Sequence, residues 1–271
     1  MQIKHDHHTL ADEMQMFTLL WTLFKTSPTQ SVKLNTGIST KDHTSTNDKL
    51  KLYRLFTSVF DVQLDDTQSS SQGITRERLG EILKKQTIEL PNLIDLGMIP
   101  RIIVRELEIL YNTPKKKIIA VPVLISYPPR NVNIDSFIDL VYKLSLSNVI
   151  VLIGERELSH KKKDVISIHE QLQQHCRSED NVSSLMIDCS RIKYETIDDF
   201  FYDMNIIYHS NAVLTLGIGG IIDAAVLCCN ATAKVYTIGT QLTPHSRFIW
   251  GNKHNSKLIK CRVFQVEDFI N

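Results

Sequence analysis

The glycine-rich segment 210–227 is the part of the chain whose residue types best suit the binding of a ligand. An apolar run over 212–216 predicts a buried strand, and the apolar stretch from 221, which carries Asp223, predicts a helix. The turn between them contains three glycines, Gly217, Gly219 and Gly220. Because glycine has no Cβ, the N–H groups of the turn and of the helix N-terminus can approach an anion closely, which predicts a phosphate site. A tight strand-to-helix turn without a ligand has the same pattern.

Strands and helices alternate along the second half of the chain. The predicted strands are 118–125, 149–153, 184–188, 212–216 and 233–238, and the predicted helices are 134–146, 165–176, 197–207 and 221 onward. Apolar strands joined by helices indicate a parallel sheet covered on both faces, and right-handed crossovers make it a doubly wound, Rossmann-like domain. Ligands of such sheets bind beyond the carboxyl ends of the strands, which is where the glycine-rich turn falls.

The first half of the chain has more helix patterns than strand patterns. Helical spacing of apolar residues predicts helices over 10–24, 50–60, 76–85 and 99–110, and short strands are predicted over 31–35 and 60–64. The segment 113–117 is charged and contains a proline, which is typical of a linker between domains. The sequence therefore predicts an α/β protein with two domains, 1–113 and 114–271.

Composition limits the classes of partner and location. The 31 basic residues nearly balance the 30 acidic ones, so no overall field attracts the protein to nucleic acid, and no stable nucleic-acid partner is expected. The five cysteines show no CxxC spacing, which indicates buried thiols in a reducing compartment. No apolar run reaches the roughly 20 residues of a membrane span, so no transmembrane segment is expected. These features predict a cytoplasmic protein.

Five segments resemble one enzyme family. They are 8–14, 118–130, 149–157, 214–227 and 233–240, and their pattern resembles the GT-B glycosyltransferases, within them the ADP-heptose:lipopolysaccharide heptosyltransferase-like group. The resemblance implies two Rossmann-like domains with parallel sheets, the N-terminal one reduced and facing the acceptor. It also implies transfer of a sugar from a nucleotide-sugar donor, held by the C-terminal domain, to an unidentified acceptor, with no cofactor and no metal.

The chain departs from that group at three positions. Ala11 stands where the group has a glycine before its aspartate. Gly217 and Ile222 stand where its donor loop has an acidic residue and a histidine. The arrangement of Gly219, Gly220 and Asp223 is closer to other GT-B enzymes, in which a carboxylate at this point binds the ribose of the nucleotide. The resemblance therefore implies a sugar-nucleotide donor more than it implies a heptose donor.

The resemblance assigns the leaving diphosphate to the three glycines of the turn and to Arg130. An arginine offers a fork of donors that matches phosphate oxygens, although a solvated loop arginine has the same sequence context. Asp223 is expected to accept hydrogen bonds from ribose hydroxyls, because burying an unpaired carboxylate among its apolar neighbours is costly. Its alternative role is to complement the helix dipole from the first turn.

Glu155 and Glu157 follow a predicted strand and are expected to contact the ribose or the base, with exposed loop charges as the alternative. On the acceptor side, the resemblance makes Asp12 the candidate general base, and an ordinary first-turn aspartate is the alternative. His8 lies close by in sequence and is expected to act as base or to orient the acceptor. The histidines around it are accompanied by no matching ligand set, so no metal site is predicted.

Three functions are compatible with these residues. The first is a metal-independent glycosyltransferase. The second is a sugar-nucleotide epimerase or hydrolase on the same fold. The third is a non-catalytic nucleotide-binding protein, which the departures at Ala11 and Ile222 favour.

Overall fold

The computed structural model describes most of the chain. The described residues are 1–4, 10–35, 60–65, 73–83, 85–86, 88–111, 116–123, 134–155, 170–172, 174, 185–192, 194–216, 220–238 and 258–261. The chain divides into two compact units, of which Met1–Pro91 forms most of unit 1 and Asn92–Gln241 forms most of unit 2. Residues 92–111 therefore belong with the C-terminal unit.

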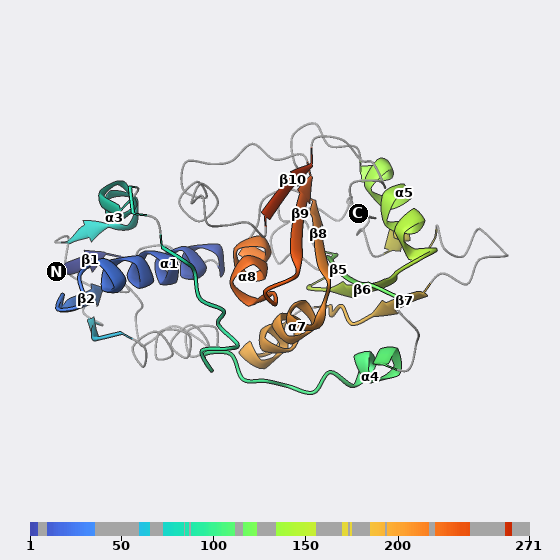
Figure 1. The fold of residues 1–271 in the computed structure, drawn as a ribbon, viewed down its shortest axis with the longest axis horizontal. Helices are drawn as coiled ribbons and strands as arrows, with labels where there is room; N and C mark the ends of the chain where they lie inside the picture. Colours follow the sequence, from blue (N-terminus) through green and yellow to red (C-terminus); the bar gives the residue numbers. More distant parts are fainter. Residues whose placement is uncertain are drawn as a thin grey trace. The chain divides into compact units, whose positions relative to one another are not determined.

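Unit 1 contains a small parallel sheet (Figure 1). Its elements are β1 (Gln2–Lys4), α1 (Leu10–Thr26), β2 (Val32–Asn35), β3 (Val62–Asp65), β4 (Ile74–Thr75) and α3 (Arg76–Leu83). The strand order is β3-β2-β1-β4, and every pair is parallel. The chain order of the strands reverses at β1, which has β2 on one side and β4 on the other.

The core of unit 1 forms between α1 and the sheet. Met14, Phe17 and Leu20 recur at helical spacing on α1 and are fully buried. The ring of Phe60, just before β3, lies 5.6 Å from that of Phe17 and 5.1 Å from that of Phe24. Burial of this apolar stripe is what holds the helix against the strands.

Unit 2 contains a larger parallel sheet. Its elements are α4 (Arg105–Tyr111), β5 (Ile118–Pro122), α5 (Ile134–Ser145), β6 (Val149–Ile153), β7 (Leu185–Asp188), α7 (Ile197–His209), β8 (Ala212–Leu216), α8 (Gly220–Cys228), β9 (Lys234–Ile238) and β10 (Leu258–Cys261). The strand order is β10-β9-β8-β5-β6-β7, and all pairs are parallel. Numbered from β5, this is the order 3-2-1-4-5-6 of the doubly wound Rossmann fold.

The sheet of unit 2 is covered on both faces. All five residues of β6 are buried, as expected of a strand with helices above and below it. In Figure 1, α5 lies on one side of the sheet and α7 and α8 lie on the other. Phe137 and Val141 of α5 are fully buried against residues of β5, β6 and β8 in one apolar cluster. The expected α/β class with two parallel sheets is confirmed.

The structure corrects several local predictions. The helix expected over 99–110 begins at Arg105, because Asn205 binds the preceding segment: its side chain accepts from the Ile102 N–H and donates to the Pro100 carbonyl, both at 2.9 Å. Strands β1, β4 and β10 were not predicted. The helix expected over 50–60 and most of that over 165–176 lie outside the described residues.

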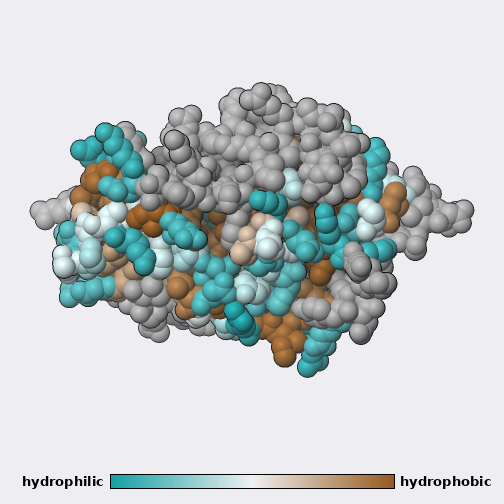
Figure 2. All heavy atoms as spheres, viewed as in Figure 1, coloured by the Kyte–Doolittle hydropathy of each residue, from teal (hydrophilic) through white to brown (hydrophobic). Residues whose placement is uncertain are grey.

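Apolar and polar side chains alternate over the described surface, as Figure 2 shows for one face. The large exposed apolar residues are spread along the chain: Ile82, Leu96, Ile103, Leu146 and Ile192. No helix among the described residues has the length and hydropathy of a membrane span. Cys189, Cys228 and Cys229 are buried and form no disulfide, as the sequence predicts.

Candidate functional site

The chain order of the unit 2 strands reverses between β5 and β8. In open α/β sheets this reversal leaves a crevice at the carboxyl ends of the two strands, where ligands bind. Strand β8 ends there at Leu216, and α8 begins four positions later at Gly220. The glycine-rich segment thus leads from this strand end to the N-terminus of α8. Gly217 and Gly219, and Arg130 after β5, lie outside the described residues.

Asp223 lies in the first turn of α8 and is 1% exposed. Its neighbours Ala224 and Ala225 are fully buried. A carboxylate in this position is stabilised by the positive end of the helix dipole. The side chain predicted to bind ribose is therefore buried in the first turn of the helix that follows the glycine-rich segment.

Glu155 follows β6 and is held by the segment after β7. Its Oε1 accepts a hydrogen bond from the Tyr194 backbone N–H at 2.8 Å, and it pairs with Arg191 in an isolated parallel bridge. Gly154, between β6 and Glu155, has φ +92°, a backbone conformation that favours glycine. Glu155 is thus part of an ordered strand end, and Glu157 lies outside the described residues.

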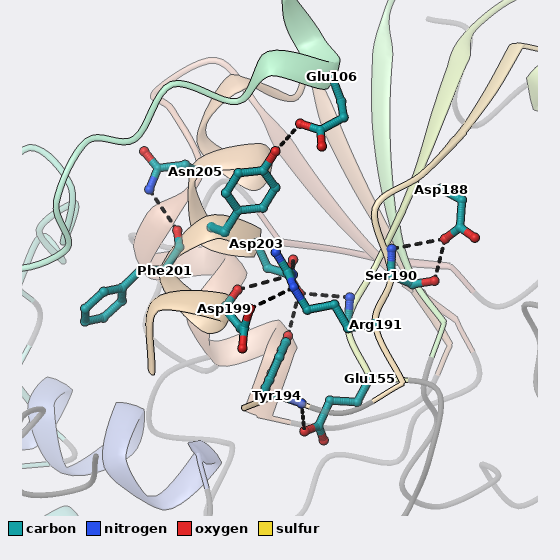
Figure 3. A network of polar contacts seen from close by, with 12 residues as sticks. Glu106, Glu155, Asp188, Ser190, Arg191, Tyr194, Asp199, Phe201, Asp203 and Asn205 are labelled. Atoms are coloured by element: carbon teal, nitrogen blue, oxygen red, sulfur yellow. Dashed lines mark hydrogen bonds and ion pairs between the residues drawn. The ribbon is translucent and has the colours of Figure 1, made fainter. Parts of the chain in front are cut away.

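A buried aspartate on α7 is the centre of the polar network around Glu155 (Figure 3). The Asp203 side chain is fully buried. Its Oδ2 accepts from the Gly154 N–H at 2.9 Å and from the Tyr194 hydroxyl at 2.5 Å. Its Oδ1 lies 3.0 Å from Nη1 of Arg191. The network therefore joins α7 to the carboxyl ends of β6 and β7.

Besides its ion pair with Asp203, Arg191 contacts Asp199 and Tyr202. Its Nε lies 2.9 Å from Oδ1 of Asp199, and its guanidinium stacks over the ring of Tyr202 at 5.0 Å. Asp199 also accepts from the backbone N–H groups of Glu195 and Thr196, which completes a capping box at the start of α7. Tyr202 in turn donates to Glu106 of α4.

The pKa of Asp203 predicts a pH dependence of stability. Burial raises this pKa from 3.8 to about 6, although the hydrogen bond from Tyr194 and the charge of Arg191 lower it. Between these two pH values the folded state keeps a proton that the unfolded state has released, so stability falls as pH rises. Relative to the Asp203→Asn variant, the wild-type free energy of unfolding is expected to fall by about 2 kcal/mol from pH 4 to pH 7.

Urea unfolding of both proteins at several pH values measures this difference. Asp198→Asn changes an exposed aspartate of the same helix and is the matched control. The free energies of unfolding of this variant and of wild type should differ by an amount that does not change around pH 6. A gap between wild type and Asp203→Asn that is constant with pH would show that Asp203 is ionised throughout this range.

The sheet of unit 1 has a corresponding reversal of strand order. The strand order of its sheet reverses between β1 and β4, and α1 follows the carboxyl end of β1. Asp12 is in the first turn of α1, as predicted. His8 lies between β1 and α1, outside the described residues.

Sequence reasoning missed Asp203, Arg191 and Tyr194. The available signal was an aspartate within the apolar stretch 200–207, since a charge on the buried face of a helix requires a partner.

In the described part of the chain, no three His, Cys, Asp or Glu side chains are grouped as metal ligands.

The structure is similar to those of solved glycosyltransferases. A glycosyl transferase family 9 protein from Veillonella parvula matches with a TM-score of 0.53 and 10% identity, over 99% of this chain and 87% of that one. ADP-heptose lipopolysaccharide heptosyltransferase II of E. coli matches with a TM-score of 0.50 and 11% identity, over 97% and 90%. The dodecameric iron-containing heptosyltransferase TibC, in complex with ADP-D-beta-D-heptose, matches with a TM-score of 0.52 and 12% identity, over 90% and 59%.

No model of a known family matches the sequence, and no curated protein matches it. The similarity is thus one of structure, carried by two parallel sheets whose chain order reverses at the first strand. Together with the three solved structures, this arrangement shows that the chain has the GT-B fold of glycosyltransferases.

Proposed function

We propose that the protein is a glycosyltransferase that moves a sugar from a nucleotide-sugar donor to an acceptor hydroxyl without a metal ion. The observation that carries the proposal is the position of α8: a glycine-led helix with a buried first-turn carboxylate begins at the switch point of a Rossmann-order sheet. This geometry suits a nucleoside diphosphate, because helix N–H groups receive the phosphates and a carboxylate receives the ribose hydroxyls.

The donor is held by the C-terminal unit in this proposal. Gly217, Gly219 and the N-terminus of α8 receive the diphosphate, and Arg130 supplies positive charge to it. Asp223 accepts from the ribose, and Glu155 or Glu157 accepts from the ribose or the base. The same N–H groups and the same arginine stabilise the charge that develops on the diphosphate as it leaves.

Transfer then needs only a base at the acceptor. The acceptor oxygen forms a bond to the anomeric carbon while the bond from that carbon to the diphosphate oxygen breaks, and the hydroxyl proton passes to Asp12. The electron pair of the broken bond leaves with the nucleoside diphosphate. His8 orients the acceptor or shares the proton.

Thermal unfolding with a panel of nucleoside diphosphates tests donor binding. A nucleotide at 100 times its dissociation constant is expected to raise the apparent free energy of unfolding by about 2.7 kcal/mol. The Asp223→Asn variant should require more nucleotide for the same shift, because one ribose acceptor is replaced by a partial donor. Absence of a shift with every diphosphate would refute the proposed donor site.

Turnover assays separate the remaining possibilities. Release of the nucleotide only when an acceptor is added supports transfer, and loss of the donor without acceptor indicates an epimerase or hydrolase. Binding without turnover of any sugar nucleotide supports the non-catalytic function, which Ala11 and Ile222 favour.

A further inference from the structure

A closed ring of hydrogen bonds joins the end of β6 to helix α7 (Figure 3). The Gly154 N–H and the Tyr194 hydroxyl both donate to Oδ2 of Asp203. The Tyr194 backbone N–H donates to Glu155, the residue that follows Gly154. Glu155 is thus linked to Asp203 on two sides, through the chain at Gly154 and through Tyr194.

Asp203 sets the direction in which the chain leaves β6. Gly154 has both backbone polar groups in the network: its N–H donates to Asp203, and its carbonyl accepts from the Arg191 N–H at 2.9 Å. The φ of +92° at Gly154 is the bend that makes both bonds possible. The backbone from which Glu155 projects is therefore fixed by a side chain 49 positions further along the chain.

The contribution of this network to the stability of the fold does not by itself account for its presence. A buried ion pair is often no more stabilising than apolar side chains of the same volume, and here the Asp203 side chain is fully buried beside an Arg191 that is 26% exposed. The network does fix the rotation of the Glu155 carboxylate, through one of about four acceptor sites that a carboxylate offers. Glu155 is only partly buried.

We propose that Asp203 and Tyr194 are positioning residues that hold Glu155 ready to accept hydrogen bonds from the ribose of the bound nucleotide. This assignment rests on the proposed function, because it takes the ligand to be a nucleoside diphosphate. It adds a specific role: the buried network recognises the nucleoside part, whereas the start of α8 receives the diphosphate.

The test measures how one substitution changes the affinity of the protein for two different ligands. Tyr194→Phe removes the hydroxyl that bonds Asp203 and leaves the backbone N–H in place. It is expected to weaken binding of a nucleoside diphosphate about tenfold, the size of one lost hydrogen bond to a charged group. Binding of inorganic pyrophosphate should stay within about twofold, because the helix end is unchanged. Titration calorimetry measures both affinities.

A double-mutant cycle and a control complete the test. In a Glu155→Gln background, Tyr194→Phe should cause no further loss, since it acts through Glu155. Tyr208→Phe removes an exposed tyrosine hydroxyl on α7, one that donates to Asp95, and should change neither affinity. Asp203→Asn, which keeps the side-chain volume, should reproduce the selective loss.

Three results overturn the assignment. Equal weakening of both ligands by Tyr194→Phe would mean that the network only stabilises the fold. Unchanged nucleotide binding would mean that Glu155 is not positioned by it. If the wild-type protein binds no nucleoside diphosphate, the proposed function fails and the positioning role fails with it, which the wild-type titration reveals by itself.

Discussion

Replacing Asp12 with asparagine is expected to lower the rate of sugar transfer by about 10²- to 10⁴-fold, the contribution of a general base. Asparagine keeps the size of the side chain and cannot take a proton from the acceptor hydroxyl. The nucleotide is held by the other unit in our proposal, so nucleoside diphosphate binding should be unchanged. Initial rates with donor and acceptor, together with calorimetry of the diphosphate, measure the two effects separately.

Glu13→Gln is the matched control for Asp12→Asn. It neutralises the next residue of the same helical turn, so it has nearly the same effect on the net charge and on the helix dipole. Transfer by this variant should stay close to wild type. Full activity of Asp12→Asn would remove Asp12 from the mechanism and transfer the role of base to a residue such as His8.

Phe137→Ala is expected to lower the free energy of unfolding by about 3–5 kcal/mol, the range for removing a buried aromatic ring. The Phe137 side chain is fully buried on α5 and belongs to the apolar cluster formed with β5, β6 and β8. Its loss leaves a cavity that the close-packed sheet cannot fill. Urea unfolding followed by circular dichroism measures the change.

Leu146→Ala is the control for the cavity. Leu146 follows α5 directly and is 45% exposed, so its replacement should change stability by less than about 1 kcal/mol. Similar losses in the two variants would mean that α5 is not anchored to the sheet through Phe137.

Strands β5, β6, β8 and β9 were predictable because most of their described residues are buried on both faces of the sheet. The apolar run of β6 is continuous, that of β8 is interrupted only by Thr215, and glycines follow both, so local pattern and tertiary position agree. Strands β1 and β4 are three and two residues long. In so short a span the alternation of apolar and polar residues carries no period, and pairing with β2 and with each other decides their conformation.

The strand ends that carry the candidate site residues were predictable, and the contacts that support them were not. Strand ends and glycines are local features, and they indicated the start of α8 after β8, where Gly220 and Asp223 lie. Asp203 contacts Gly154 across 49 positions of sequence, which no local pattern reports. Its apolar neighbours Met204 and Phe201 indicate that it is buried, but only the fold shows which strand end it binds.

The uniform direction of the strands has a consequence for how this chain can vary. Within each sheet every strand runs the same way, so in each unit turns that follow strands collect at one edge of the sheet and turns that follow helices at the opposite edge. Residues that would contact substrates belong to the turns that follow strands. Insertions, deletions and substitutions in the turns that follow helices leave the substrate-binding residues unchanged. This explains how the chain can match the glycosyl transferase family 9 structure over 99% of its length at 10% identity.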